Sequence, residues 1–347
     1  MLRNVWHDPV WSKVIASAIL AAVGSALVWL DVSHAEHAPA PKAVISRYSR
    51  FAVVSDISDG VTALAFTQHG RLLVVGTGEG KILVWNTSEK RIVNTILAHK
   101  KAVSSLSFSA DGSLLASASR DETVKLWHFP TGVPEAVWRA AGARHALAFS
   151  PVQDVLALGD VDGLALYKVL RGDAVKVELS STLPSPGTAW PSRVAFRPDG
   201  TSVAMAGQSG IAQTTLVPVW NTKNWTMVHM LRTPSDIYDI SVSPGGLLAS
   251  GGSDKAITVW DLEQGKVVYT LVGHAGPVTA VAFSPDGEEL ASGADDRKIY
   301  LWGTRDRELL ETVDTVDNTV SPIEFSPNNG RFLAAGVYTD LVIWARN

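Results

Sequence analysis

Residues 103–138 read VSSLSFSADGSLLASASRDETVKLWHFPTGVPEAVW, and they contain one complete copy of the unit that builds most of the chain. Apolar and small polar residues alternate along four short runs, separated by the turn sequences SADG, RDE and PTG. Period-two alternation interrupted every few positions by turn residues predicts an antiparallel meander of four strands. One such sheet cannot bury both of its faces alone, so the unit requires neighbours of its own kind.

The unit recurs with a nearly constant step. An aromatic residue of the third run marks each copy: Trp85, Trp127, Tyr167, Trp220, Trp260, Trp302 and Trp344. A residue that ends the first run keeps the same step: Phe66, Phe108, Phe149, Phe196, Val242, Phe283 and Phe325. A period of about 40–45 residues is typical of propellers. The sequence therefore predicts an all-β fold, a seven-bladed β-propeller of four-stranded antiparallel blades.

The last copy ends on its third strand, at LVIWARN (341–347). We expect residues 50–54, which precede the first full copy, to supply the missing fourth strand. Pairing an N-terminal strand with the last blade removes an exposed sheet edge and ties the two ends of the ring together.

Several segments of the sixth copy resemble the WD-repeat family of β-propellers: Gly273 and His274, AFSPDG (282–287), LASGADD (290–296) and IYLW (299–302). The resemblance extends over residues 48–347. In that family a histidine, a strand serine, a turn aspartate and the tryptophan form a hydrogen-bonded tetrad that holds each blade.

Two copies have all four residues of the tetrad: His99, Ser117, Asp121 and Trp127, and His274, Ser292, Asp296 and Trp302. A third copy keeps Ser250, Asp254 and Trp260 but lacks the histidine. The resemblance implies a structural role for these residues. We therefore assign no catalytic residue, no metal ligand and no cofactor site, and we expect the protein not to be an enzyme.

Composition limits the classes of partner. The net charge is −4 with a pI of about 6.1, and no basic run or basic stripe with interleaved aromatic residues is present. Nucleic acid is therefore not expected as a partner. Cysteine is absent, so disulfides and thiolate metal sites are impossible.

The N-terminal residues follow a different pattern from the repeats. After a tail at 1–13, residues 14–30 read VIASAILAAVGSALVWL without a charge, enough for roughly 25 Å of helix at 1.5 Å per residue. Three interpretations remain open: an uncleaved membrane anchor, a cleaved signal peptide with Ser33-His34-Ala35 as its processing site, and a buried helix. The tryptophans at positions 11 and 29 favour the anchor. Residues 31–47 then form an extended linker.

Orientation follows from the short basic tail, which by default stays inside. We expect a single-pass anchor with the propeller on the periplasmic or extracellular side. The alternatives are a soluble periplasmic product and a propeller that faces the cytoplasm. The stretch HDPVWSK (7–13) resembles juxtamembrane sequence of bacterial membrane-anchored proteins.

Two insertions interrupt the repeat, at residues 183–191 and 208–215. One precedes a first strand and the other follows a second strand, so both are predicted at the same end of the meander. Insertions on one face of a repeat array often mark its binding face. Trp190 lies in the first inserted loop, and basic residues are expected on neighbouring loops of that end: Lys100, Lys101, Arg120 and Arg144.

These observations predict a membrane-tethered scaffold or sensor that binds a protein or peptide through one loop face. The alternative is a propeller enzyme or small-molecule-binding protein that uses the central channel. Polar side chains of the first runs are few and fall at differing positions, which argues against a shared channel site: His145, Arg193, Asp239 and Glu324.

Overall fold

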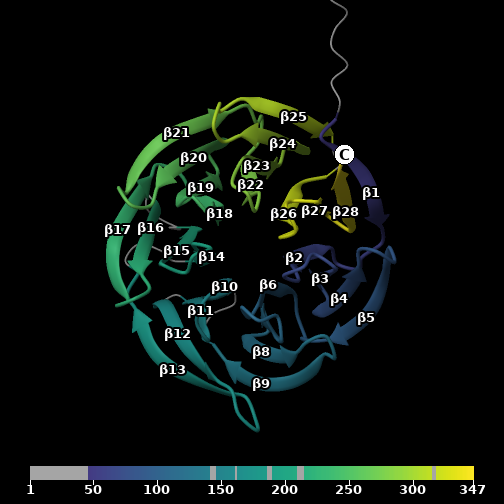
Figure 1. The fold of residues 1–347 in the computed structure, drawn as a ribbon, viewed down its shortest axis with the longest axis vertical. Coiled ribbons are helices and arrows are strands. Elements are labelled where there is room, and N and C mark those ends of the chain that lie inside the picture. The colour runs from purple at the N-terminus through teal and green to yellow at the C-terminus, as the bar shows by residue number, and fades with distance from the viewer. Residues whose placement is uncertain (1–45, 141–145, 161, 186–189, 209–214, 315–317) are drawn as a thin grey trace, which may run out of the picture. The chain divides into compact units, whose positions relative to one another are not determined.

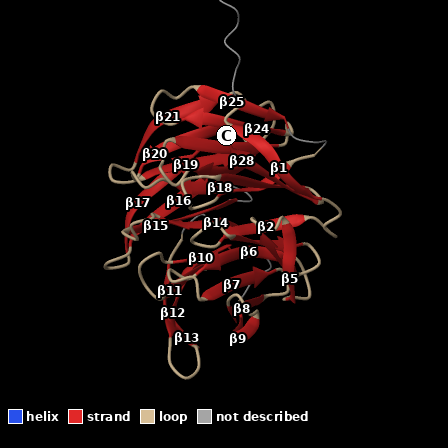
Figure 2. Cartoon of the chain, turned by 45° about the vertical axis from the view of Figure 1, so that its right-hand side comes forward, coloured by secondary structure: helices blue, strands red, loops and turns tan. Residues whose placement is uncertain are grey.

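The computed structural model describes residues 46–347 except 141–145, 161, 186–189, 209–214 and 315–317. Ser46–Asn347 form one compact unit. Every regular element in the described part is a β-strand (Figure 2). Within that part no helix could cross a lipid bilayer, and the hydrophobic stretch at 14–30 lies outside the described residues.

Seven four-stranded antiparallel sheets surround a central channel, with the first strand of each blade innermost (Figure 1). The strands of blades 1 to 3 are β2 (Val61–Phe66), β3 (Leu72–Thr77), β4 (Lys81–Asn86), β5 (Arg91–Leu97), β6 (Val103–Phe108), β7 (Leu114–Ser119), β8 (Thr123–His128), β9 (Val133–Arg139), β10 (Ala146–Phe149), β11 (Val155–Asp160), β12 (Gly163–Leu170) and β13 (Lys176–Leu183). The predicted fold class is confirmed.

Blades 4 to 7 follow the same order, except that the last blade takes its outer strand from the start of the chain. Their strands are β14 (Trp190–Phe196), β15 (Ser202–Gln208), β16 (Thr215–Asn221), β17 (Thr226–Thr233), β18 (Ile237–Val242), β19 (Leu247–Gly252), β20 (Ala256–Asp261), β21 (Lys266–Val272), β22 (Val278–Phe283), β23 (Glu289–Ala294), β24 (Lys298–Gly303), β25 (Leu309–Asp314), β26 (Val320–Phe325), β27 (Phe332–Val337), β28 (Asp340–Arg346) and β1 (Tyr48–Val54).

The core lies between blades. All six residues of β7 are buried, because the second strand of each blade is covered on both faces by neighbours. Small side chains dominate this strand, and the adjacent blade contributes bulkier ones such as Phe149 and Leu158 to the same cluster. Trp220 is 1% exposed, which makes it the largest fully buried side chain. At Gly80 (φ +86°) a Cβ atom would lie 2.4 Å from the carbonyl oxygen of His99, so this hairpin requires glycine.

The ring closes as the sequence predicts. β1 pairs antiparallel with β28, with register partners running from Tyr48 and Arg346 to Val54 and Leu341. The fourth strand of blade 7 is therefore the first strand of the described chain, and it begins two residues before residue 50.

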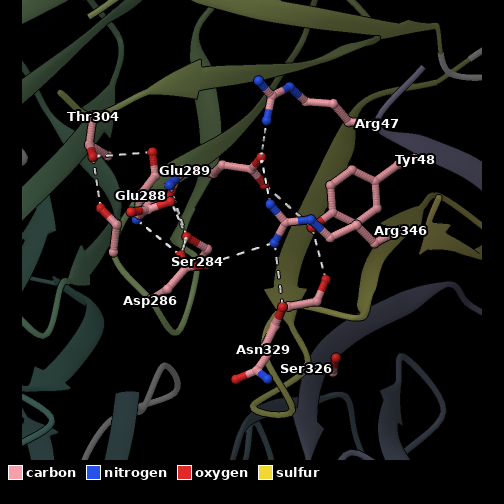
Figure 3. Close-up of polar contacts among 12 residues, drawn as sticks. Arg47, Tyr48, Ser284, Asp286, Glu288, Glu289, Thr304, Ser326, Asn329 and Arg346 are labelled. Atoms are coloured by element: carbon pink, nitrogen blue, oxygen red, sulfur yellow. Dashed lines mark hydrogen bonds and ion pairs between the residues drawn. The ribbon is translucent and has the colours of Figure 1, made fainter. Parts of the chain in front are cut away.

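A polar cluster fastens this closing strand to blade 6 (Figure 3). The carboxylate of Glu289, at the start of β23, is 2% exposed. Its Oε1 lies 2.8 Å from Nη1 of Arg47 and 3.3 Å from Nη2 of Arg346. The Tyr48 hydroxyl donates to the Gly330 carbonyl oxygen at 2.8 Å, and burial, followed by the charge of Glu289, raises the tyrosine pKa. Both ends of the propeller thus converge on one buried carboxylate.

Candidate functional site

One mouth of the channel is lined by hydroxyl groups. In six blades the innermost strand bulges after its first or second residue, and a residue at the bulge borders a depression of about 330 Å³. A bulge redirects a side chain away from the regular pleat. These residues are Thr62, Ser104, Ser192, Tyr238, Thr279 and Ser321. Sequence reasoning missed this ring, although a hydroxyl residue recurs at that position in six copies.

Trp190 and Arg120 border the same depression. The structure corrects the prediction that Trp190 lies in an inserted loop: it is the first residue of β14 and pairs with Gln208 at the end of β15. The first insertion ends next to Trp190 and the second begins at Gln208. Because these two residues pair, the two insertions meet the propeller side by side. Trp190 is 47% exposed, so a large aromatic surface faces solvent at the channel mouth.

The predicted basic residues lie on the adjacent turns of blades 1 and 2. The backbone N–H of Lys100 donates to Oδ2 of Asp121 at 2.8 Å, and the N–H of Arg120 donates to the Ala102 carbonyl oxygen at 3.0 Å. These bonds join the two turns, and the residues Lys100, Lys101 and Arg120 are exposed. Arg144 falls outside the described residues.

Three charged side chains meet inside the channel, contrary to the expectation that they share no site. Arg193 of blade 4 points toward blade 5, where its Nε lies 3.4 Å from Oδ1 of Asp239. Its Nη2 lies 3.7 Å from Oε2 of Glu324 in blade 7. The positions of these residues along their strands did not predict the contact, because the long side chain of Arg193 reaches across the channel. The fourth candidate, His145, is outside the described residues.

The surroundings of this channel cluster shift its pKa values. Asp239 is buried and accepts the N–H groups of Ile240 and Val281, each at 3.0 Å; burial raises its pKa against the opposing effect of Arg193. Burial raises the pKa of Glu324 to about 7, with Arg193 opposing the shift and Asp239 adding to it. About a third of the Glu324 side chain is accessible, and the residue lines the channel. Two carboxylates thus share one guanidinium.

The structure brings the four members of the first predicted tetrad together in blade 2. His99 Nε2 lies 2.8 Å from the Ser117 hydroxyl, which also accepts Nε1–H of Trp127 at 2.9 Å. His99 Nδ1 lies 3.3 Å from Oδ1 of Asp121 and 2.9 Å from Oγ1 of Thr123. Burial lowers the pKa of His99 to about 4, so the imidazole is neutral at pH 7.

The second tetrad, in blade 6, has the same geometry. His274 Nε2 lies 2.8 Å from Oγ of Ser292, and its Nδ1 lies 2.9 Å from Oδ2 of Asp296. Trp302 donates to Oγ of Ser292 at 2.8 Å. In both sets the serine hydroxyl is enclosed between its histidine and its tryptophan, so it has no open path to a substrate.

Blade 5 and blade 1 keep less of this arrangement. In blade 5, Trp260 Nε1–H still donates to the Ser250 hydroxyl, at 3.2 Å. In blade 1, Val75 occupies the serine position, and Nε1 of Trp85 is buried with no hydrogen-bond partner among the described residues. The described residues contain no group of three or more His, Asp or Glu side chains placed to hold a metal ion.

Comparison with known proteins identifies the repeat. The profile of the WD40 family, described as WD domain, G-beta repeat, matches residues 52–86, 90–128, 225–261 and 265–303. WD repeat-containing protein VIP3 of Arabidopsis thaliana is 30% identical over 198 residues, which are 50% of this chain and 56% of that protein.

Two further relatives show similar coverage. The small ribosomal subunit protein RACK1 of Caenorhabditis elegans is 28% identical over 56% of this chain and 58% of its own length. The non-functional target of rapamycin complex subunit LST8-2 of Arabidopsis thaliana is 29% identical over 56% of this chain and 63% of its own length. The matches span less than two thirds of each of these three eukaryotic relatives. The chain is a seven-bladed β-propeller, and four of its segments match the WD40 repeat.

Proposed function

We propose that this propeller is a non-enzymatic interaction scaffold or sensor that binds a protein or peptide around the channel mouth. The observation that carries the proposal is that Trp190 and Arg120 line the same depression. The Trp190 side chain is 47% exposed there and lies beside exposed basic turns. Tryptophan and arginine are enriched at interface hot spots. Two of the relatives carry names that make them subunits of larger assemblies, which supports a role in complex formation.

The partner is proposed to present an acidic patch. Lys100, Lys101 and Arg120 lie on joined turns beside the depression, and a partner of opposite charge would associate faster at low salt. The test is capture of partners from detergent-solubilised native membranes by the unaltered chain, Trp190→Ala and Arg120→Glu. Arg305→Glu, an exposed arginine on the opposite face, is the matched control.

Loss of capture in the first two variants, and not in the control, is the expected result. Equal capture by all four chains would show that the partner does not bind at the channel mouth. The same capture at rising salt should weaken for the unaltered chain and change little for Arg120→Glu.

The proposal includes a membrane tether at residues 14–30, with the propeller outside the cytoplasm. It rests on the uncharged apolar run and its flanking tryptophans. A tethered chain should sediment with membranes and resist carbonate extraction, whereas a soluble product that begins near residue 36 would establish cleavage. Protease access in intact cells then tests the side on which the propeller lies.

A second candidate function is binding of a small polar ligand inside the channel, favoured by the cluster of Arg193, Asp239 and Glu324. Glu324 titrates near neutral pH, which suits recognition of a group that carries or exchanges a proton. Screening small ammonium and carboxylate compounds by thermal shift, with Arg193→Met as the control, tests this candidate.

A further inference from the structure

The seven blades carry equivalent turns, so each turn can be compared with its counterparts in the same molecule. The turn between first and second strands places an aspartate in blades 2, 4 and 6, at Asp111, Asp199 and Asp286. Blades 3 and 5 carry Val152 and Gly245 there, and blades 1 and 7, which are neighbours in the ring, also lack the aspartate. Blades 1 and 7 carry His69 and Asn328 at the equivalent position, and each follows with an arginine.

With His69 and Asn328 in place of aspartates, and an arginine after each, the hollow between blades 1 and 7 is basic. The hollow has a volume of about 850 Å³ and is lined by residues of three turns and of the closing strand. Its charged lining residues are Arg71, Lys90 and Arg331, with His69 beside them. No aspartate or glutamate is among the lining residues. The volume lies within the roughly 300–1,000 Å³ typical of small-molecule sites.

A second hollow on the same face, between blades 6 and 7, shows the contrast. Its lining includes Asp286, Glu288, Glu289 and Asp306, and its arginines contact these carboxylates. Arg71 of blade 1 occupies the position of Glu288 in blade 6. The two hollows lie on the same face and differ in charge, so the positive charge is not a general property of this face.

The three cations lack carboxylate partners in the described part of the chain. Lys90 Nζ instead lies 3.9 Å from the ring centroid of Phe51, and the Arg331 guanidinium lies 5.3 Å from that of Phe332. These cation–π contacts hold the side chains in place without neutralising them. The nearest acidic residue of the turn, Glu89, is already paired with Arg91 and accepts from Asn86 at 2.7 Å.

We propose that this hollow binds a phosphate-bearing ligand through Arg71, Lys90 and Arg331. The cations come from three separate turns, β2–β3, β4–β5 and β26–β27, and so approach one volume from three directions. A phosphate monoester offers three terminal oxygens and a charge of about −1.5 to −2, which suits convergent cations. A carboxylate offers two coplanar oxygens, which suit one guanidinium fork. The arrangement therefore favours phosphate.

The site is independent of the channel mouth. The turn after Phe66 lies at the opposite end of β2 from Thr62, so the hollow and the Trp190 depression are on opposite faces. Failure of one proposal leaves the other intact.

The test is calorimetric titration of the full chain with O-phosphoserine and pyrophosphate at low salt, with glutarate as the dicarboxylate comparison. The phosphate compounds should bind, and the double variant Arg71→Glu/Arg331→Glu should bind at least tenfold more weakly. Arg305→Glu, on the same face but in the blade 6 hollow, should bind as the unaltered chain does. Lys90→Gln provides a milder variant, with an expected loss of several-fold, should the double variant fold poorly.

Vesicles distinguish the source of the phosphate. Retention on phosphatidylinositol phosphate vesicles, absent on phosphatidylcholine and lost in the double variant, would identify a lipid headgroup. Binding of the soluble esters without vesicle retention would identify a soluble ligand, and both results support the site. Absence of phosphate binding, unchanged binding by the double variant, or equal affinity for glutarate would overturn the proposal.

Discussion

Arg193 and Glu324 meet across the central channel, with Nη2 of the arginine 3.7 Å from Oε2 of the glutamate. They belong to blades 4 and 7, so the contact connects nearly opposite sides of the ring. Asp239 of blade 5 holds the other side of the same guanidinium. One arginine therefore links three blades. The negative charge of Glu324, which lies farther from the guanidinium than Asp239 does, is compensated less.

The stability contribution of Glu324 should depend on pH. Its folded pKa of about 7 lies above the ordinary value of 4.5, so the folded state holds the proton more tightly between these values. The contribution is complete below about pH 4.5 and is lost as pH rises through 7. Relative to Glu324→Gln, the unaltered chain should lose on the order of 1–2 kcal/mol of unfolding free energy between pH 5 and 8. Parallel pH profiles for the two chains would contradict this.

Removal of the closing strand should open the ring. A chain that begins at residue 55 lacks β1, exposes the edge of β28 and loses the buried side chain of Tyr48. We expect a cost of several kcal/mol compared with a chain that begins at residue 41. Thermal melts of the two chains measure it, and equal midpoints would show that closure does not stabilise the propeller.

Glu289→Gln should weaken the same closure without removing a strand. The substitution is nearly isosteric but removes the charge on which Arg47 and Arg346 converge. Because the side chains of both arginines are about 45% and 34% exposed and can regain water, we expect a cost of about 1–3 kcal/mol. Glu288→Gln, one residue earlier and exposed, is the control and should cost much less. Denaturant unfolding of both variants provides the comparison.

Asp121→Ala should destabilise blade 2. The carboxylate contacts His99 and accepts the backbone N–H groups of Lys100 at 2.8 Å and Thr123 at 3.0 Å, so its loss removes the acceptor of both N–H groups. We expect the free energy of unfolding to fall by about 1–3 kcal/mol. Asp254→Ala in blade 5, where the tetrad histidine is absent and the carboxylate accepts the Ala256 N–H at 3.2 Å, should cost less. Equal costs in chemical unfolding would show that the histidine adds nothing.

Trp190→Ala should leave the melting temperature nearly unchanged, because the side chain is 47% exposed at the channel mouth. Trp220→Ala, which removes a side chain 1% exposed, should cost about 3–5 kcal/mol. Differential scanning calorimetry of the two variants separates an accessible tryptophan from a core one. A large drop for Trp190→Ala would assign it to the core and remove the main support for the binding face.

The spacing of aromatic residues was sufficient to predict the blades, because each repeat packs an aromatic side chain at the same place, such as the buried Trp220 or the partly buried Tyr167. Strand alternation and turn residues gave the four strands of each blade, and the missing last strand pointed to closure by the start of the chain. These features are local or periodic, so they can be recognised without knowing which segments touch.

The channel and the basic hollow depend on contacts between different blades. Trp190 pairs with Gln208, Arg193 reaches Glu324, and Arg71 and Arg331 line one hollow, although each pair is separated by a different number of residues. The bulges that turn hydroxyl groups toward the channel also follow from pairing register rather than from residue type. The sequence alone therefore determines the seven-bladed ring, whereas only the tertiary structure decides which charged side chains share a site, because ring closure brings together residues that the repeat period keeps apart.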